Sequence, residues 1–295
     1  MNIEIKNVKI FNNISFVAHS ARVSGVGKIK SEEGFRDPTD KEIFAMILEN
    51  DYSSALEHII FTFEIHGLSK GNSAELLEHR IASHTGRSTR YQSEADFDYT
   101  LPPAISDILN KYGLSQQDYK KMVEKGNVNL DNIEKKDIDI LNLYSKVIHT
   151  SRSVYNSLLK LKVPKESARY ALPFSVHTSY TYTINLRSLI NLLGLRLCVR
   201  ASPEMKCLAS KIYLAVRKVF PEIDNVWCRG YNFAVCPENE VRDSPQGKDC
   251  PFKNPENDIF IPTKKHIKAG IELEPFNRKK SFKAKEALLK KWSEI

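Results

Sequence analysis

The sequence predicts a mixed α/β protein of the α+β type, in which helices flank a sheet. The segment Ile59–Ile65 alternates apolar and polar residues, which is the pattern of a strand with one face in the core. Amphipathic patterns predict two long helices, at Ile138–Leu161 and Asn185–Arg200. Hydrophobic residues make up 41% and charged residues 27% of the 295-residue chain, which is the balance of a folded globular protein.

The remaining elements follow from local patterns. β-branched and aromatic residues predict a strand at Ile3–Phe16, and a polar turn precedes a helix at Lys41–Glu49. Helical periodicity runs over Ser69–Ser83 and is broken at Gly86. The second half adds, in chain order, helix Gln116–Lys125, helix Lys165–Leu172, strand Ser179–Thr183, helix Pro203–Phe220 and helix Ser281–Ser293.

Changes in composition suggest how the chain is organised. We expect a core domain over residues 1–220, interrupted at residues 93–137 by a loop-rich, partly helical insertion. A C-terminal extension over residues 221–295 combines a cysteine-containing loop with a basic tail. Pro237–Asn257 is rich in Pro, Asn, Asp and Gly and is predicted to be a loop.

Charge and hydropathy limit the possible partners. From Thr263 onward ten basic and four acidic residues give +6 of the chain's net +8, so the body is nearly neutral and a nucleic-acid partner is unexpected. No apolar run approaches the roughly 20 residues that span a bilayer, and the N-terminus has no signal-peptide core. We therefore expect a cytoplasmic protein with no membrane partner.

The five cysteines fit reduced thiols in such a compartment. Cys228, Cys236 and Cys250 are spaced by eight and fourteen residues and contain no C-x-x-C pair, so we predict a structural role and no metal site.

Residues 78–91 form a polar segment dense in cations and hydroxyls. Arg80, Arg87 and Arg90, with Ser88 and backbone amides near Gly86, are suited to phosphate, because guanidinium groups match phosphate oxygens in a two-pronged way. A surface loop with incidental charges is the alternative interpretation.

The helix at 185–200 carries arginines on two faces. At about 100° per residue, Asn185 and Arg196 share one face, while Arg187 and Asn191 lie roughly opposite. Arginines on a leucine-rich helix are costly unless each has an anionic partner or reaches solvent. The pattern therefore allows two interpretations: arginines that bind anionic ligands, or arginines that reach solvent.

Together these segments resemble the flavin-dependent thymidylate synthases. That family has a signature of the form R-H-R-x-x-S-x-N-E-x-S-x-R-Y, and residues 78–91 read E-H-R-I-A-S-H-T-G-R-S-T-R-Y. Further matches stand in the expected order at Ala21-Arg22, Leu56–Phe63, Ala168–Pro173, Asn185–Leu189, Leu195-Arg196 and Arg200-Ala201.

The resemblance implies a twisted central sheet flanked by helices, assembled as a homotetramer with active sites between subunits. The implied reaction is the reductive methylation of dUMP to dTMP. Methylenetetrahydrofolate supplies the carbon, FAD carries the electrons, and NADPH reduces the flavin. A catalytic cysteine is not required.

The resemblance also assigns residues by position. Arg196 is the implied catalytic residue, against the uracil ring, where a fixed cation stabilises negative charge as C5 becomes nucleophilic. The other implied substrate-binding residues are Glu75, Gly86, Arg87, Ser88, Arg90 and Arg169. The implied flavin-binding residues are Ser54, Glu78, His79, Arg80, Asn185, Arg187 and Asn191.

The chain departs from the signature at several positions. Glu78 replaces its first Arg, Thr85-Gly86 replaces its Asn-Glu pair, and Glu75 stands where a Gln is common. Acidic groups near phosphates cost on the order of 1 kcal/mol each at contact distance. Either Arg87 and Lys70 supply compensating charge, or the chain is a divergent paralogue that modifies another pyrimidine nucleotide or binds nucleotide without turnover.

Overall fold

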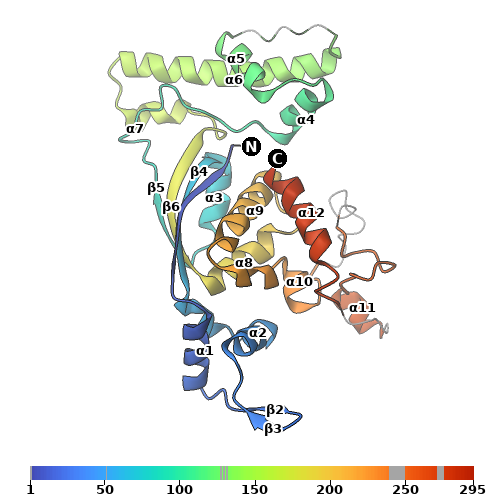
Figure 1. Cartoon of the computed structure of the whole chain (residues 1–295). Helices are drawn as coiled ribbons and strands as arrows, with labels where there is room; N and C mark the ends of the chain where they lie inside the picture. Colours follow the sequence, from blue (N-terminus) through green and yellow to red (C-terminus); the bar gives the residue numbers. More distant parts are fainter. Residues whose placement is uncertain are drawn as a thin grey trace. The chain divides into compact units, whose positions relative to one another are not determined.

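Figure 1 shows the computed structural model, which describes residues 2–50, 52–126, 128, 130, 132–238, 250–270 and 276–295. The chain divides into two compact units. Unit 1 comprises His66–Glu78 and Thr85–Tyr180 together with Asn2, and unit 2 comprises Ile3–Ile65, His79–His84 and Thr181–Ile295. The domain boundaries expected from composition, at residues 93, 137 and 220, stay a prediction.

One four-stranded sheet has the strand order β1 (Glu4–Phe11), β4 (Ile60–Ser69), β6 (His177–Asn185) and β5 (Ala82–Gly86). In β4 the side chains of Phe61, Phe63 and Ile65 are fully buried, as the alternating pattern predicted. A separate antiparallel hairpin pairs β2 (Ile29–Ser31) with β3 (Gly34–Arg36). The mixture of sheet and helices confirms the predicted α+β fold class.

The predicted helix Ser69–Ser83 is wrong in its second half. Helix α3 ends after Lys70–Leu77, and Ala82–Gly86 instead forms strand β5 at the edge of the sheet. The backbone N–H of Arg87 then donates to Ser179 O at 2.8 Å. Hydrogen bonding to a neighbouring strand therefore overrides the local helical period.

The predicted strand Ile3–Phe16 is also too long. Asn12 adopts a left-handed φ of 66°, which ends the strand. Asn13 then accepts hydrogen bonds from the N–H groups of Ser15 and Phe16 and caps helix α1 (Ile14–Val23). The two adjacent asparagines, Asn12 and Asn13, are the sequence signal for the strand end that the prediction missed.

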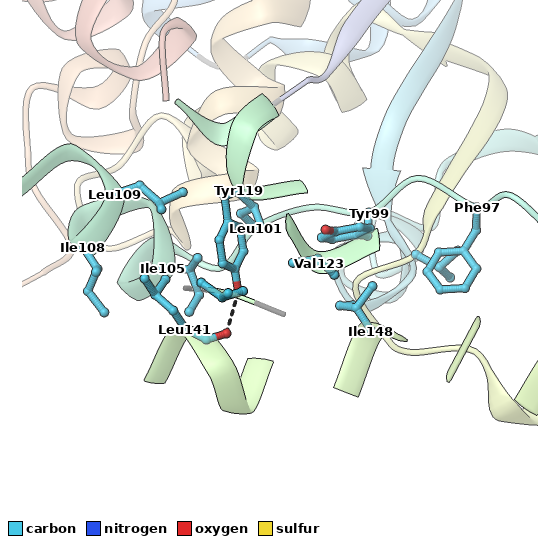
Figure 2. Packing of buried hydrophobic residues seen from close by; sticks show 12 residues of the cluster. Phe97, Tyr99, Leu101, Ile105, Ile108, Leu109, Tyr119, Val123, Leu141 and Ile148 are labelled. Atoms are coloured by element: carbon cyan, nitrogen blue, oxygen red, sulfur yellow. Dashed lines mark hydrogen bonds between the residues drawn. The ribbon is translucent and has the colours of Figure 1, made fainter. Parts of the chain in front are cut away.

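Unit 1 has its own helical core, shown in Figure 2. Its helices are α4 (Pro103–Lys111), which the sequence did not predict, α5 (Gln116–Glu124), α6 (Lys135–Lys160), α7 (Lys165–Ala168) and the 3-10 turn η2 (Arg169–Ala171). Tyr119 is buried among aliphatic side chains, and its hydroxyl donates to Leu141 O at 2.7 Å. This bond ties α5 to α6.

Unit 2 holds the remaining helices. They are α2 (Asp40–Asn50), η1 (Ser53–His58), α8 (Leu186–Arg196), α9 (Pro203–Arg217), η3 (Pro221–Asn225), α10 (Arg229–Phe233), α11 (Lys264–Lys268) and α12 (Phe282–Ser293). Helix α12 packs on α9, so part of the C-terminal extension joins this core. Within the described ranges, no helix combines the length and apolarity needed to cross a membrane.

Lys285 in α12 is a fully buried cation. Its Nζ donates to Asp224 O at 2.6 Å and to Val226 O at 3.3 Å. The same Nζ lies 4.6 Å from the ring centroid of Tyr231 and 5.5 Å from that of Trp227. These contacts offset the loss of hydration and fix α12 against the segment between η3 and α10.

We predict that Lys285→Ala lowers the free energy of unfolding by about 3 kcal/mol, because two carbonyl acceptors lose their donor and a cavity forms. Lys285→Met keeps the apolar stem and should cost less. Urea unfolding measures both changes. Lys283→Ala, at an exposed position of the same helix, is the control and should change stability little. Equal effects at positions 283 and 285 would contradict the buried role.

Candidate functional site

The loop after β5 brings Arg90 to the short helix α7 in unit 1, whose C-cap is Arg169. The N–H groups of Tyr91 and Gln92 both donate to Ser88 O, at 3.3 and 3.0 Å, which turns the chain. From this turn Arg90 reaches Glu166 in α7, with Nη2 3.1 Å from Oε2. Arg169 follows Glu166 by three residues at the end of the same helix.

Lys70 adds a third cation to this region. It is half-buried at the start of α3, and burial lowers the pKa of its ammonium. The charges of Arg169 and Arg87 lower this pKa further, while Glu94 raises it. Glu94 is the charge that acts most strongly on Lys70, and the two arginines add a positive potential that favours a further anion.

Arg87 is held mainly by an acidic partner. Its Nε lies 2.8 Å from Oε1 of Glu94, a buried carboxylate, and its Nη2 donates to Ser93 O at 3.2 Å. Arg87 also lines a cavity of about 400 Å³ whose wall includes Glu94, Asp96 and Asp98. The acidic wall makes this cavity a poor site for phosphate.

Gly86 is in close contact with Tyr180. A Cβ added at Gly86 would lie 2.6 Å from Cε1 of Tyr180, closer than two carbon atoms approach without displacement. The ring of Tyr180 thus fills the space where the family's glutamate side chain would begin. The loss of the signature's Glu is therefore matched by local packing.

In unit 2, Arg196 is held by His79. The Nε of Arg196 donates to Nε2 of His79 at 3.0 Å, and His79 is buried. Burial, and then the charge of Arg196, lower the pKa of His79 to about 4. A neutral imidazole is the form that can accept this bond, so the guanidinium is oriented without charge repulsion.

The exposed face of α8 carries a second set of polar groups. Arg187 Nη1 lies 2.5 Å from Oε1 of Glu57. Asn191 Oδ1 accepts from Nη2 of Arg229 at 3.0 Å, and Asn185 caps the helix by accepting from the N–H of Ser188. Arg229 was missed because no local motif marks it; only the contact of α10 with α8 brings it here.

The other predicted residues are more exposed. Ser54 lies at the surface in η1, Glu75 is half-buried in α3, and Glu78 caps that helix. Arg80 is exposed and forms no ion pair with any residue that the structure describes. The predicted site residues thus fall in both units. Unit 1 contains Glu75, Glu78, Gly86, Arg87, Ser88, Arg90 and Arg169. Unit 2 contains Ser54, His79, Arg80, Asn185, Arg187, Asn191 and Arg196.

Comparison with known proteins gives consistent matches. A family model described as thymidylate synthase complementing protein matches residues 9–222. The flavin-dependent thymidylate synthase of Sulfolobus acidocaldarius is 32% identical over 77% of this chain and 74% of its own length. The Clostridium tetani enzyme of the same name is 28% identical over 76% of this chain and 86% of its own length. A crystal structure of the Helicobacter pylori flavin-dependent thymidylate synthase, complexed with FAD and dUMP, shares 28% identity and a TM-score of 0.50, and the match covers 73% of this chain and 93% of that one.

We predict that Gly86→Ala lowers the free energy of unfolding by about 1–3 kcal/mol, because the new Cβ overlaps Tyr180. The cost should shrink when Tyr180 is also replaced by Ala, and a double-mutant cycle by thermal unfolding measures this coupling. Gly27→Ala, where an added carbon meets nothing within 4 Å, is the control. If the stability changes of Gly86→Ala and Tyr180→Ala simply added in the double variant, the new Cβ would not overlap the ring of Tyr180.

The pKa of His79 also predicts a pH dependence of stability. Folded His79 has a pKa of about 4 against an ordinary value of 6.5, so only the unfolded chain binds the proton between these values. The stability that neutral His79 contributes is therefore fully present above pH 6.5, its ordinary pKa, and is lost as the pH falls toward 4. In His79→Gln roughly one proton fewer should be taken up on unfolding near pH 5. The control His149→Gln, at an exposed position, should keep the pH dependence of stability seen in the wild type. If His79→Gln also kept this pH dependence, His79 would not be buried in its neutral form.

Proposed function

The chain belongs to the flavin-dependent thymidylate synthase family, and from this we propose that it converts dUMP to dTMP using FAD, methylenetetrahydrofolate and NADPH. The observation that carries the proposal is the hydrogen bond from Arg196 to a buried, neutral His79. The family uses this arginine position at the uracil ring. The Helicobacter pylori relative, complexed with FAD and dUMP, supports both ligands.

We assign the nucleotide phosphate to the cations of unit 1. Arg90 and Arg169 provide guanidinium groups, Ser88 provides a hydroxyl, and Lys70 provides the compensating charge that the altered signature lacks. Arg90 would exchange Glu166 for the phosphate. Arg87 stays with Glu94 and shapes the loop, so we give it a supporting role.

Arg196 would act on the uracil ring. Its Nε bond to His79 fixes the guanidinium plane, so the cation need not reorganise as negative charge develops on the ring. His79 can fill this role only while it is neutral, which its low pKa secures.

The polar face of α8 fits a flavin dinucleotide. Arg187, Arg229 and Asn191 offer guanidinium and amide groups at the surface, and exposed Arg80 adds a further cation, which suits a diphosphate. The resemblance also assigns Ser54 and Glu78 to the flavin, and Asn185 would fix the start of α8. When bound, FAD supplies the electrons that reduce the transferred carbon.

A second candidate function is nucleotide binding without turnover, or modification of another pyrimidine nucleotide. The specific observation in its favour is Tyr180, which occupies the space at Gly86 where the family has a glutamate. If that glutamate is needed for the reaction, the phosphate site would survive and activity would not.

We further propose a cytoplasmic homotetramer with shared active sites and without a membrane or nucleic-acid partner. Helix α6 supports subunit contacts, because Leu143, Val147, Val154 and the adjoining Leu161 expose apolar side chains along it.

The test is purification of the full chain followed by a flavin absorbance spectrum and a tritium-release assay with 5-labelled dUMP, folate and NADPH. Bound flavin and NADPH-dependent release of tritium support the synthase. Bound flavin and dUMP without release favour the second candidate. A colourless protein that does not take up FAD contradicts both the cofactor and the reaction.

We predict that Lys70→Met weakens dUMP binding roughly tenfold, which corresponds to about 1.4 kcal/mol, because a half-buried cation facing the phosphate is lost. Calorimetric titration of the flavin-loaded protein measures this change. Lys160→Met, at an exposed position of α6, should bind dUMP like the wild type. Full affinity in Lys70→Met would remove this lysine from the phosphate site.

A further inference from the structure

Four of the five cysteines line one small cavity in unit 2. Cys198 follows α8, Cys228 precedes α10, and Cys236 and Cys250 come from the segments after it. The cavity has a volume of about 30 Å³. Its other walls are largely apolar and include Trp227, Phe252 and Leu288. The fifth cysteine, Cys207, is buried in α9 away from this cavity.

The four thiols are near neighbours. Cys228 interacts electrostatically with each of Cys198, Cys236 and Cys250. Cys198 and Cys250 also interact with Cys236. Only Cys198 comes from the part of the chain before residue 220, so the sequence spacing of the other three gave no sign of a fourth partner.

Backbone N–H groups point at three of the sulfurs. The N–H groups of Arg200, Tyr231 and Phe252 donate to Cys198, Cys228 and Cys250 respectively. Each donor comes two or three residues after its cysteine. Burial raises the pKa of all three thiols, so without metal they are protonated, and the backbone donors offset part of this shift.

Cys236 is fixed by its backbone. Its N–H donates to Pro262 O at 2.7 Å. Gly230 lies so close that a Cβ added there would be 3.2 Å from the Cβ of Cys236. Cys236 therefore has a fixed backbone at the wall of the cavity.

We propose that Cys198, Cys228, Cys236 and Cys250 bind one zinc ion as thiolates. Zinc favours four sulfur ligands in a tetrahedron with bonds of about 2.3 Å, and a cavity of this size suits a single ion rather than an iron–sulfur cluster. Water would find few partners between apolar walls. Binding releases four thiol protons to solvent.

Charged groups of both signs surround the cavity. Zinc with four thiolates carries a net charge of −2, and two cations act on these sulfurs, Arg200 on Cys198 and Lys253 on Cys250. Glu238 also lines the cavity, pairs with Arg200 and acts on Cys198 with the opposite sign. Among the described residues no three His, Cys, Asp or Glu side chains already form a metal-ligand group, so the ion would draw the thiols inward by side-chain rotation. Cys198 follows Arg196 by two residues, so the ion would also tie the C-terminal loops to the end of α8.

The test is elemental analysis of the full chain purified without chelator, and its result does not depend on flavin or nucleotide turnover. We expect about one zinc ion per chain. Cys228→Ser and Cys250→Ser should each lose most of the zinc, whereas the control Cys207→Ala should keep it. A strong chelator should lower the midpoint of thermal unfolding of wild type and Cys207→Ala by several degrees.

A measurement on the wild type alone covers the case in which the serine variants do not fold. Chelated protein is refilled with Co²⁺, and tetrahedral thiolate coordination should give absorption bands beyond those of the flavin. The proposal is overturned by metal-free protein whose thiols all react with a thiol reagent on unfolding. Two further results would also overturn the proposal. One is metal-free protein whose cysteines resist alkylation, which indicates disulfides. The other is protein that contains iron in place of zinc.

Discussion

The candidate site depends on the placement of arginine side chains, three of which are held by a partner from another part of the chain. Arg196 is held by His79, Arg90 by Glu166 and Arg187 by Glu57. A free guanidinium on a flexible stem would lose conformational entropy on binding a ligand. The partners restrict the cations beforehand, and the exposed acidic ones can be exchanged for a phosphate at small cost.

His79 differs from the acidic partners in one respect. A neutral imidazole accepts the bond from Arg196 and orients the guanidinium without adding a charge of its own. In our proposal, the burial of His79 supports the position of Arg196. This role differs from the flavin contact that the resemblance implied for His79.

The departures from the family signature are local and partly compensated. Tyr180 occupies the space at Gly86, so the two positions form one packing unit. Lys70 lies close enough to Arg169 and Arg87 to interact with their charges, which supports the interpretation that it restores positive charge near the phosphate. The cysteine cavity lies at the other end of α8 from the helix cap at Asn185, so both ends of the helix that carries Arg196 are anchored.

The sequence by itself determined the fold class, most of the helices and the family, because side-chain periodicity and ordered motifs are local properties of the chain. It predicted the strand Ile59–Ile65, but it misassigned Ala82–Gly86, whose strand conformation depends on hydrogen bonds to a distant strand. The assignment of two ligands to the two faces of α8 stays a prediction. Only the tertiary structure decided which groups meet. The contacts of Arg196 with His79, of Arg229 with Asn191 and of Cys198 with the later cysteines join residues far apart in the chain, and no local pattern encodes such distances.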